Sequence, residues 1–111
     1  MRGQKVKFVN EKSFNSRCYE ILRKVSRGKV ITYKALARSL GNPRAARAVG
    51  NALNKNPYAP KVPCHRVVKS NGEVGGFASG TKKKIEMLKK EGVDVKDGKI
   101  ELKKYLHKFY N

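Results

Sequence analysis

The sequence predicts a mainly α fold: a compact helical domain with a helix-turn-helix, winged-helix-like in form, and a short C-terminal β-hairpin. Apolar residues recur at helical spacing between positions 13 and 25. Gly41-Asn42-Pro43 separates two further segments of helical pattern, which is the sequence form of a helix-turn-helix. Asp97-Gly98 lies inside a stretch of alternating apolar and polar residues, which favours a two-residue hairpin turn.

The first helix is expected to start at an N-cap, Ser13 or Asn15, and to run to about Val25. Cys18 lies on its apolar side, so we interpret Cys18 as a core residue and not as a reactive thiol. Residues 1–12 then form a short basic N-terminal arm, and residues 13–111 form one domain. The apolar side comprises Phe14, Cys18, Ile21, Leu22 and Val25.

The helix-turn-helix begins at Thr32, a favourable N-cap for a helix over residues 33–40 that Gly41 ends. Asn42 is the expected cap of the second helix, which covers 43–54 and has a proline at its first position. This second helix combines arginines with very small residues and has no acidic partners. Such a basic face of low relief fits a nucleic-acid groove. The residues concerned are Arg44, Ala45, Ala46, Arg47, Ala48 and Gly50.

The second half is predicted to hold a loop, one long helix and the hairpin. The glycines of the loop over 74–80 allow its backbone to line a pocket, and the loop lacks the phosphate-binding P-loop pattern. Thr81 is the expected N-cap of a helix that ends near Glu91, with Gly92 as its stop. The hairpin covers about 93–102.

The charge of the chain is strongly positive. Lys and Arg number 27 against 8 Asp and Glu, a net charge of +19, so a polyanionic partner is expected. Residues 1–55 hold 14 basic and 2 acidic residues, which favours the first half as the nucleic-acid face. An anionic membrane surface and plain solvated lysine faces are the alternatives. No apolar run is long enough to span a membrane and no signal peptide is visible, so we expect a cytoplasmic location, nucleoid-associated or, in a eukaryote, nuclear.

The chemistry of the chain centres on Pro63-Cys64-His65-Arg66-Val67-Val68. A free thiol has a pKa of about 8.5 and reacts as the thiolate, so a neighbouring base can activate it. Adjacent residues in an extended chain point to opposite faces, and the pair alone therefore also fits a buried structural cysteine. Two cysteines and two distant histidines do not form a zinc-ligand pattern, and we expect neither a metal nor a cofactor.

Three blocks between about Ser13 and Gly92 resemble the O6-alkylguanine-DNA alkyltransferase family. The resemblance implies the catalytic domain of that family, and we expect its usual N-terminal domain to be absent because only about a dozen residues precede the first helix. The blocks are Thr32-Tyr33 with Leu36-Ala37, Gly41-Asn42-Pro43-Arg44-Ala45-Ala46-Arg47-Ala48-Val49-Gly50, and Asn56-Pro57 through Pro63-Cys64-His65-Arg66-Val67-Val68 to Gly75.

The resemblance implies a role for each of five residues. Cys64 takes an alkyl group from O6 of a damaged guanine, or from O4 of thymine, irreversibly and once per molecule. His65 acts as the base through a water, and Glu91 orients His65. Asn56 braces the loop between the DNA-binding helix and the active site, and the Tyr33 hydroxyl donates to the base edge.

The resemblance also implies double-stranded DNA as the partner of a monomeric protein. The damaged base is flipped out, and Arg47 fills the vacated stack. The second helix enters the minor groove, where its small residues permit close approach, so binding is sequence-independent and salt-sensitive. Lys34 and Ser70 are expected phosphate contacts. The guanine pocket is expected to comprise Pro63, Val67, Val74, Gly75, Ala78 and Ser79.

The chain departs from the family pattern in its glycine-rich loop, where Phe77 replaces a tyrosine of some relatives and Ala78-Ser79 replaces a Ser-Gly pair. Two other functions stay open. Alkyltransferase-like proteins bind damage without transfer, but they lack the reactive cysteine and typically have tryptophan there, whereas this chain has Cys64 and no tryptophan. A plain helix-turn-helix regulator would leave Cys64, His65 and Glu91 without a role.

Overall fold

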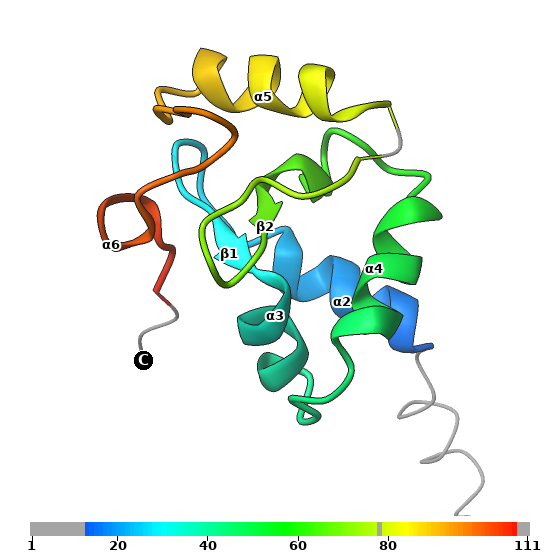
Figure 1. The fold of residues 1–111 in the computed structure, drawn as a ribbon. Helices are drawn as coiled ribbons and strands as arrows, with labels where there is room; N and C mark the ends of the chain where they lie inside the picture. Colours follow the sequence, from blue (N-terminus) through cyan, green and yellow to red (C-terminus); the bar gives the residue numbers. More distant parts are fainter. Residues whose placement is uncertain (1–12, 78, 109–111) are drawn as a thin grey trace, which may run out of the picture.

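The computed structural model describes residues 13–77 and 79–108, so the predicted arm over 1–12 and the predicted pocket residue Ala78 lie outside the described residues. Helices lie on opposite sides of a small central sheet (Figure 1). The elements in chain order are α2 (Phe14–Leu22), β1 (Ile31–Thr32), α3 (Tyr33–Ser39), α4 (Ala46–Asn54), the 3₁₀ turn η1 (Cys64–Arg66), β2 (Val67–Val68), α5 (Thr81–Lys90) and α6 (Leu102–Tyr105).

The first two helices start at side-chain caps. The Ser13 hydroxyl accepts a hydrogen bond from the Ser16 amide at 3.0 Å, and the Thr32 hydroxyl accepts one from the Ala35 amide at 3.0 Å. Helix α2 ends at Leu22, slightly earlier than predicted. Val25 nevertheless stays buried, because the chain folds back over the same core after the helix.

Helix α4 begins at Ala46, three residues later than predicted. Residues 43–45 form a turn instead, in which Asn42 Oδ1 accepts a hydrogen bond from the Arg44 amide at 3.0 Å. The side chain of Asn42 therefore forms this Asx turn and does not cap the helix. The structure thus contains the two expected helices, α3 and α4, but the turn that joins them is longer than predicted.

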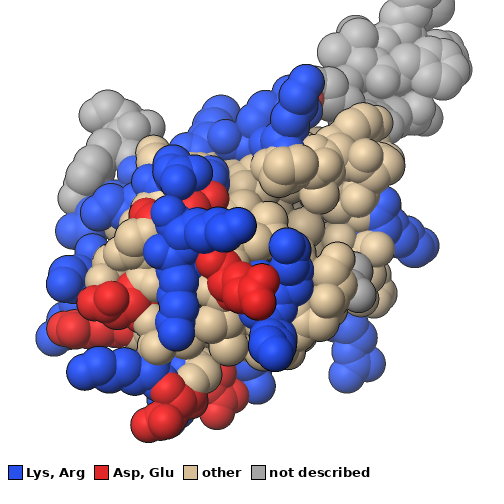
Figure 2. Space-filling view, turned by 90° about the horizontal axis from the view of Figure 1, so that it is seen from above, with Lys and Arg blue, Asp and Glu red and all other residues tan. Residues whose placement is uncertain are grey.

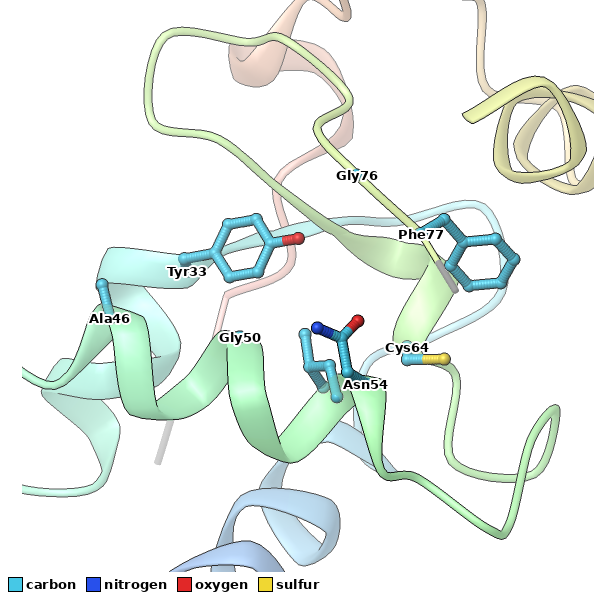
Figure 3. Close-up of a pocket in the computed structure, with 8 residues that line it drawn as sticks. Tyr33, Ala46, Gly50, Asn54, Cys64, Gly76 and Phe77 are labelled. Carbon is cyan, nitrogen blue, oxygen red and sulfur yellow. The ribbon is translucent and has the colours of Figure 1, made fainter. Parts of the chain in front are cut away.

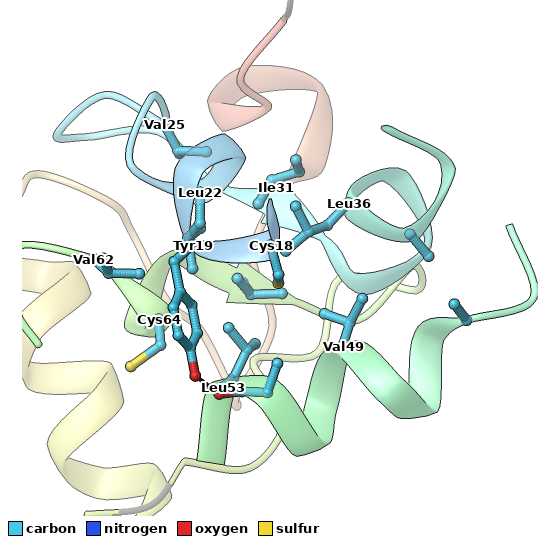
Figure 4. Packing of buried hydrophobic residues seen from close by; sticks show 14 residues of the cluster. Cys18, Tyr19, Leu22, Val25, Ile31, Leu36, Val49, Leu53, Val62 and Cys64 are labelled. Carbon is cyan, nitrogen blue, oxygen red and sulfur yellow. Dashed lines mark hydrogen bonds between the residues drawn. The ribbon is translucent and has the colours of Figure 1, made fainter. Parts of the chain in front are cut away.

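Helices α2, α3 and α4 share one hydrophobic core (Figure 4). Tyr19 from α2 lies against α4, and its hydroxyl donates a hydrogen bond of 2.6 Å to the Ala52 carbonyl. Cys18 is fully buried in this core, and burial raises its pKa to about 11. Cys18 is therefore a packing residue whose thiol stays protonated at neutral pH.

The central sheet consists of β1 and β2, which pair in parallel with Ile31 opposite Val67 and Thr32 opposite Val68. This pairing was not predicted, because each strand has two residues and its partner lies far along the chain. The pairing determines where two site residues lie. Strand β1 leads directly into α3 at Tyr33, and β2 follows directly after η1, so the pairing places Tyr33 and Cys64 in one region of the molecule.

The predicted C-terminal hairpin is present only as its turn. Lys96 and Lys99 exchange two backbone hydrogen bonds of 2.9 Å around Asp97-Gly98, whose φ angles of +52° and +74° suit a two-residue turn. The flanking residues do not form paired strands with each other. Ile100 and Gly98 pair instead with a segment of the chain near Gly72, so the alternating pattern predicted the wrong partner for the hairpin arms.

Helix α5 begins at Thr81, and its N-cap is Gly80. Thr81 is therefore not the capping residue that the sequence predicted. Its hydroxyl contacts the Gly75 carbonyl at 3.4 Å. Leu88 of this helix packs into a second hydrophobic cluster with Val30, Val68 and Val74. Within the described ranges, no helix has both the length and the apolar character that crossing a membrane requires.

Candidate active site and nucleic-acid interface

Cys64 opens the short turn η1, and Pro63 precedes it in a buried position. Only 8% of Cys64 is exposed, and that part faces a pocket of about 370 Å³, a volume within the usual range for ligand sites. In Figure 3, Tyr33 lies at one end of this pocket and Cys64 at the other, with α4 along one side and Phe77 opposite. The pocket is lined by Tyr33, Ala46, Gly50, Leu53, Asn54, Cys64, Gly76 and Phe77.

The backbone of η1 holds Cys64 in a fixed position. The Cys64 amide donates to the Val62 carbonyl at 2.9 Å, and the Val67 amide donates to the Cys64 carbonyl at the end of the turn. Side chains in a 3₁₀ turn do not alternate between two faces as they do in a strand. Cys64 and His65 therefore need not point to opposite faces. The turn also packs against α5, which brings the next two residues to the end of that helix.

His65 and Arg66 both bind Glu91, the C-cap residue of α5. His65 Nε2 lies 2.9 Å from Glu91 Oε2. Arg66 donates from Nε to Oε1 at 2.9 Å and from Nη2 to Oε2 at 2.8 Å, and its Nη1 donates to the Val25 carbonyl at 2.7 Å. His65 is 2% exposed, so this network is held away from solvent.

The charges of the network follow from its contacts. Burial by itself would raise the pKa of Glu91, but hydrogen bonds from Arg66 and His65 outweigh burial and lower that pKa from 4.5 to about 2. Burial lowers the pKa of His65, Glu91 acts in the opposite direction, and the positive charges of Arg66 and Lys84 add to the lowering. At neutral pH the site therefore holds an ionised carboxylate beside a neutral imidazole.

Lys84 is a site residue that the sequence did not reveal. It is fully buried, and its Nζ donates to the Gly76 carbonyl at 3.1 Å and lies 5.7 Å from the centre of the Tyr33 ring. Burial lowers the pKa of Lys84 to about 8, and negative charge on Cys64 opposes that shift. Its helical spacing from Leu88 was the available signal, but Lys84 ends a run of three lysines that looks like a solvated face.

Gly75 lies beside the ring of Tyr33, which lines the pocket. A Cβ atom on Gly75 would lie 3.6 Å from Tyr33 Cε2 and 3.3 Å from Lys69 Cγ, and the φ of Gly75 is +77°. Burial raises the pKa of Tyr33, as does negative charge on Cys64. The Tyr33 hydroxyl therefore keeps its proton at neutral pH and can act as a donor in the pocket.

Asn56 closes the loop that connects α4 with Cys64. Its Nδ2 donates to the Val62 carbonyl at 2.8 Å, and its Oδ1 accepts from the Tyr58 amide at 2.9 Å. One side chain thus joins both ends of the segment that precedes Pro63. Replacing this amide would remove one of the two hydrogen bonds that the Val62 carbonyl accepts, the other coming from the Cys64 amide.

A wider hollow of about 820 Å³ adjoins the Cys64 pocket, and the two share Tyr33, Ala46 and Gly76 as lining residues. The structure brings three predicted DNA-contact residues, Lys34, Arg47 and Ser70, together around this hollow from three separate segments. Among the described residues neither Arg44 nor Arg47 has an acidic partner, and both are exposed.

The small residues of α4 divide into two groups. Ala46 and Gly50 line the pocket, and a Cβ on Gly50 would meet nothing within 4 Å, so the helix surface there is low. Ala45 is buried in the core and Ala48 packs against it, which means that packing accounts for these two. Only part of the predicted low-relief face is therefore free to approach a ligand.

The predicted guanine pocket differs from the lining of the Cys64 pocket. Val67 and Val74 have side chains buried in the two cores, and Ser79 is exposed. Gly75 lines the wider hollow. The prediction from sequence did not include Leu53 and Asn54, because no motif marks them. Both lie in the last turn of α4 and line the pocket.

Basic side chains are not confined to the α3–α4 end. The face that carries α5 also shows many Lys and Arg side chains, here interspersed with Asp and Glu (Figure 2). This mixture agrees with the sequence, in which 6 of the 8 acidic residues follow position 55. In the part of the chain that the structure describes, no group of three or more His, Cys, Asp or Glu residues could hold a metal ion.

Comparisons with known proteins agree over most of the chain. The model of the 6-O-methylguanine DNA methyltransferase DNA-binding domain matches residues 13–93. A methylated-DNA–protein-cysteine methyltransferase from Methanosarcina acetivorans is 46% identical over 79 residues, covering 71% of this chain and 51% of that protein. The chain spans about half the length, or less, of the curated relatives it matches, with shares of 29%, 51% and 54% in three of them.

Two similar solved structures differ in how much of this chain they cover. Mycobacterium tuberculosis OGT in complex with DNA has a TM-score of 0.70 at 37% identity and covers 73% of this chain and 49% of that one. S. pombe Atl1, in complex with damaged DNA containing O6-carboxymethylguanine, has a TM-score of 0.78 at 30% identity and covers 97% of this chain and 99% of that one. The fold is thus shared with two proteins whose structures contain DNA.

Proposed function

Because the chain belongs to the 6-O-methylguanine DNA methyltransferase family, we propose that it repairs DNA by taking an alkyl group from O6 of guanine onto Cys64. The observation that carries this proposal is the arrangement around Cys64. The thiol faces a pocket of ligand size, and the adjacent His65 is neutral and is bound through Nε2 to an ionised Glu91. A plain DNA-binding module has no use for this arrangement.

The His65–Glu91 contact fixes which ring nitrogen can act as a base. An ionised carboxylate only accepts hydrogen bonds. Nε2 of His65 therefore carries the ring proton and donates a hydrogen bond to Glu91. Nδ1 is then the nitrogen with a free lone pair. We assign to Nδ1 the removal of the Cys64 proton, through a bridging water, which leaves a thiolate as the nucleophile.

In the transfer step the thiolate forms a bond to the alkyl carbon while the bond between that carbon and O6 breaks. The bonding electrons remain on guanine, where the Tyr33 hydroxyl donates to the base edge and the cationic Lys84 lies beside the Tyr33 ring. These groups stabilise the negative charge that develops on the leaving base. The product at Cys64 is a thioether, which water does not hydrolyse, so each molecule reacts once.

The wider hollow is the proposed entry for a flipped base. It leads from the exposed side chains of Lys34, Arg47 and Ser70 to the rim that it shares with the Cys64 pocket. Arg47 would fill the stack that the base leaves, and Lys34 and Ser70 would contact phosphates. We propose binding by a monomer in the minor groove without sequence preference, which predicts a strong dependence on salt.

A second candidate function is recognition of damaged DNA without transfer. The similarity to Atl1, which extends over 97% of this chain and 99% of that one, favours this candidate. The presence of Cys64 and of the His65–Glu91 contact favours transfer. The two candidates differ in one measurable respect, because only transfer leaves a covalent mark on the protein.

The chain offers a matched pair of variants to test transfer. The wild type and the Cys18→Ser and Cys64→Ser variants are incubated with a duplex whose O6-methylguanine carries a radioactive methyl group. We expect protein-bound label in the wild type and in Cys18→Ser, and none in Cys64→Ser, which should still bind the duplex. Label in Cys64→Ser, or no label in the wild type, would contradict the proposal.

A further inference from the structure

The loop that follows β2 lines both hollows. Residues 69–77, here called the pocket loop, contribute Gly76 and Phe77 to the Cys64 pocket and five residues to the wider hollow. Within the loop, the Lys69 amide donates to the Glu73 carbonyl at 2.8 Å and the Gly72 amide donates to the Lys69 carbonyl at 2.9 Å. These bonds close a small turn, but they do not attach the loop to the rest of the molecule.

Two segments attach the loop to the rest of the molecule. Helix α5 holds its last residues, because Lys84 Nζ and the Thr81 hydroxyl donate to the Gly76 and Gly75 carbonyls. Residues 94–108, here called the brace, hold its middle. The Ile100 amide donates to the Gly72 carbonyl at 2.8 Å, and the Val74 amide donates to the Gly98 carbonyl at 2.9 Å. The two backbones run antiparallel at this point. They also approach closely, because a Cβ atom on Gly72 would lie only 2.8 Å from the Ile100 carbonyl oxygen. Only glycine at position 72 permits this pairing.

The other end of the brace is fixed beside β1. The Val30 amide donates to the Tyr105 carbonyl at 2.8 Å, and the His107 amide donates to the Val30 carbonyl at 2.7 Å. Ile100 and Tyr105 are 6% and 8% exposed and pack in the second hydrophobic cluster. The brace therefore connects the strand that leads to Tyr33 with the loop that carries Gly76 and Phe77.

The brace lies beyond the region that defines the family. The family model ends at residue 93, whereas the similarity to Atl1 covers 97% of the chain and so extends into the brace. We infer that the brace holds the pocket loop in one position and thereby restricts the site to small alkyl groups. This inference rests on the proposed transfer to Cys64. Gly76 and Phe77 line the same pocket as Cys64, so the position of the loop sets the space that an O6 substituent has beside the thiol.

The test compares two glycine variants of matched backbone. Gly72 and Gly92 have φ values of +92° and +89°, so alanine is strained to a similar degree at both. A Cβ on Gly72 collides with the brace, whereas a Cβ on Gly92 meets nothing within 4 Å. Each variant is reacted at saturating concentration with duplexes carrying O6-methylguanine or O6-benzylguanine. Hydrogen exchange of the Val74 and Ile100 amides reports whether the pairing is open.

We expect Gly72→Ala to accelerate exchange at both amides and to raise the ratio of benzyl to methyl transfer rates by about tenfold. Gly92→Ala should leave the ratio at the wild-type value. The inference is overturned if exchange accelerates and the ratio does not change. Should Gly72→Ala fail to fold, Ile100→Val loosens the packing of the brace in the second hydrophobic cluster by removing one methylene group, and it must raise the ratio in the same direction. A wild type that transfers neither group would instead contradict the proposed function.

Discussion

Arg66 and Glu91 form a bidentate ion pair, in which Arg66 Nε lies 2.9 Å from Glu91 Oε1 and Arg66 Nη2 lies 2.8 Å from Glu91 Oε2. The same Oε2 lies 2.9 Å from His65 Nε2. The guanidinium therefore holds the carboxylate in the orientation in which it binds the histidine. Arg66 thus controls the proposed base without contacting the substrate, and the stability and chemistry of the site both depend on it.

Replacing Arg66 with glutamine should destabilise the protein by about 3 kcal/mol, because it leaves the carboxylate of Glu91 partly buried without its main partner. Urea denaturation measures the change. Lys69→Gln is the matched control, since its ion pair with Glu73 is exposed and should contribute no more than about 1 kcal/mol. Equal losses in the two variants would contradict a structural role for the Arg66–Glu91 pair.

The stability of the protein should depend on Glu91 in acid. The pKa of Glu91 is about 2 in the folded protein and 4.5 is its ordinary value. Its contribution is therefore complete above pH 4.5 and is lost as the pH falls from 4.5 toward 2. Denaturation measured across this range should show a weaker pH dependence in Glu91→Gln. Glu86→Gln, an exposed change on the same helix, should keep the wild-type dependence.

The rate of transfer should stay constant as the pH falls through 6.5. Burial lowers the pKa of His65 below that ordinary value, so the neutral ring persists to more acidic pH and continues to serve as the base. Rates measured at saturating DNA separate this effect from changes in binding. A loss of rate with a midpoint at or above pH 6.5 would show that His65 does not act as a neutral base.

Lys84 should give a second pH dependence, on the alkaline side. Its pKa is about 8 in the folded protein and ordinarily 10.5, so the unfolded chain binds more protons between these values. Stability should therefore rise with pH from 8 to 10.5, by roughly 3 kcal/mol at most. Lys84→Met should abolish this rise and slow transfer, because it removes the cation beside Tyr33. Lys83→Met, at an exposed position, should do neither.

Replacing Arg47 with alanine should slow repair of a duplex far more than reaction with the free alkylated base, because only the duplex requires a flipped nucleotide. Arg38→Ala is the control, since Arg38 is exposed on α3 but does not line the wider hollow. The measurement is the transfer rate constant of each variant with the duplex and with the free alkylated base. Equal slowing of duplex and free base in Arg47→Ala would exclude the proposed role in base flipping.

Local signals in the sequence predicted the helices well. Thr32 caps the helix that it was expected to cap, and Ser13, one of the two caps expected for the first helix, caps α2, because a capping bond joins residues only three positions apart. Asn42 and Thr81 were expected to cap as well, but their side chains bind elsewhere. Capping signals thus located the helical regions and were less reliable for the first residue of each helix.

Contacts between distant segments could not be predicted in the same way. The parallel pairing of Ile31 with Val67 joins residues far apart in the chain, and no local pattern specifies a partner for a two-residue strand. The arms of the predicted hairpin paired with the pocket loop for the same reason, since alternation defines a strand but not its neighbour. Lys84 was overlooked because only the folded packing reveals that one lysine of three is buried.

Transfer to Cys64 is tested most directly by the intact mass of the protein after incubation with a duplex carrying one O6-methylguanine. Each molecule should gain one methylene equivalent, on the peptide that contains Cys64, and a second addition of DNA should cause no further change. An unchanged mass despite selective binding of the damaged duplex would contradict transfer and support recognition without chemistry.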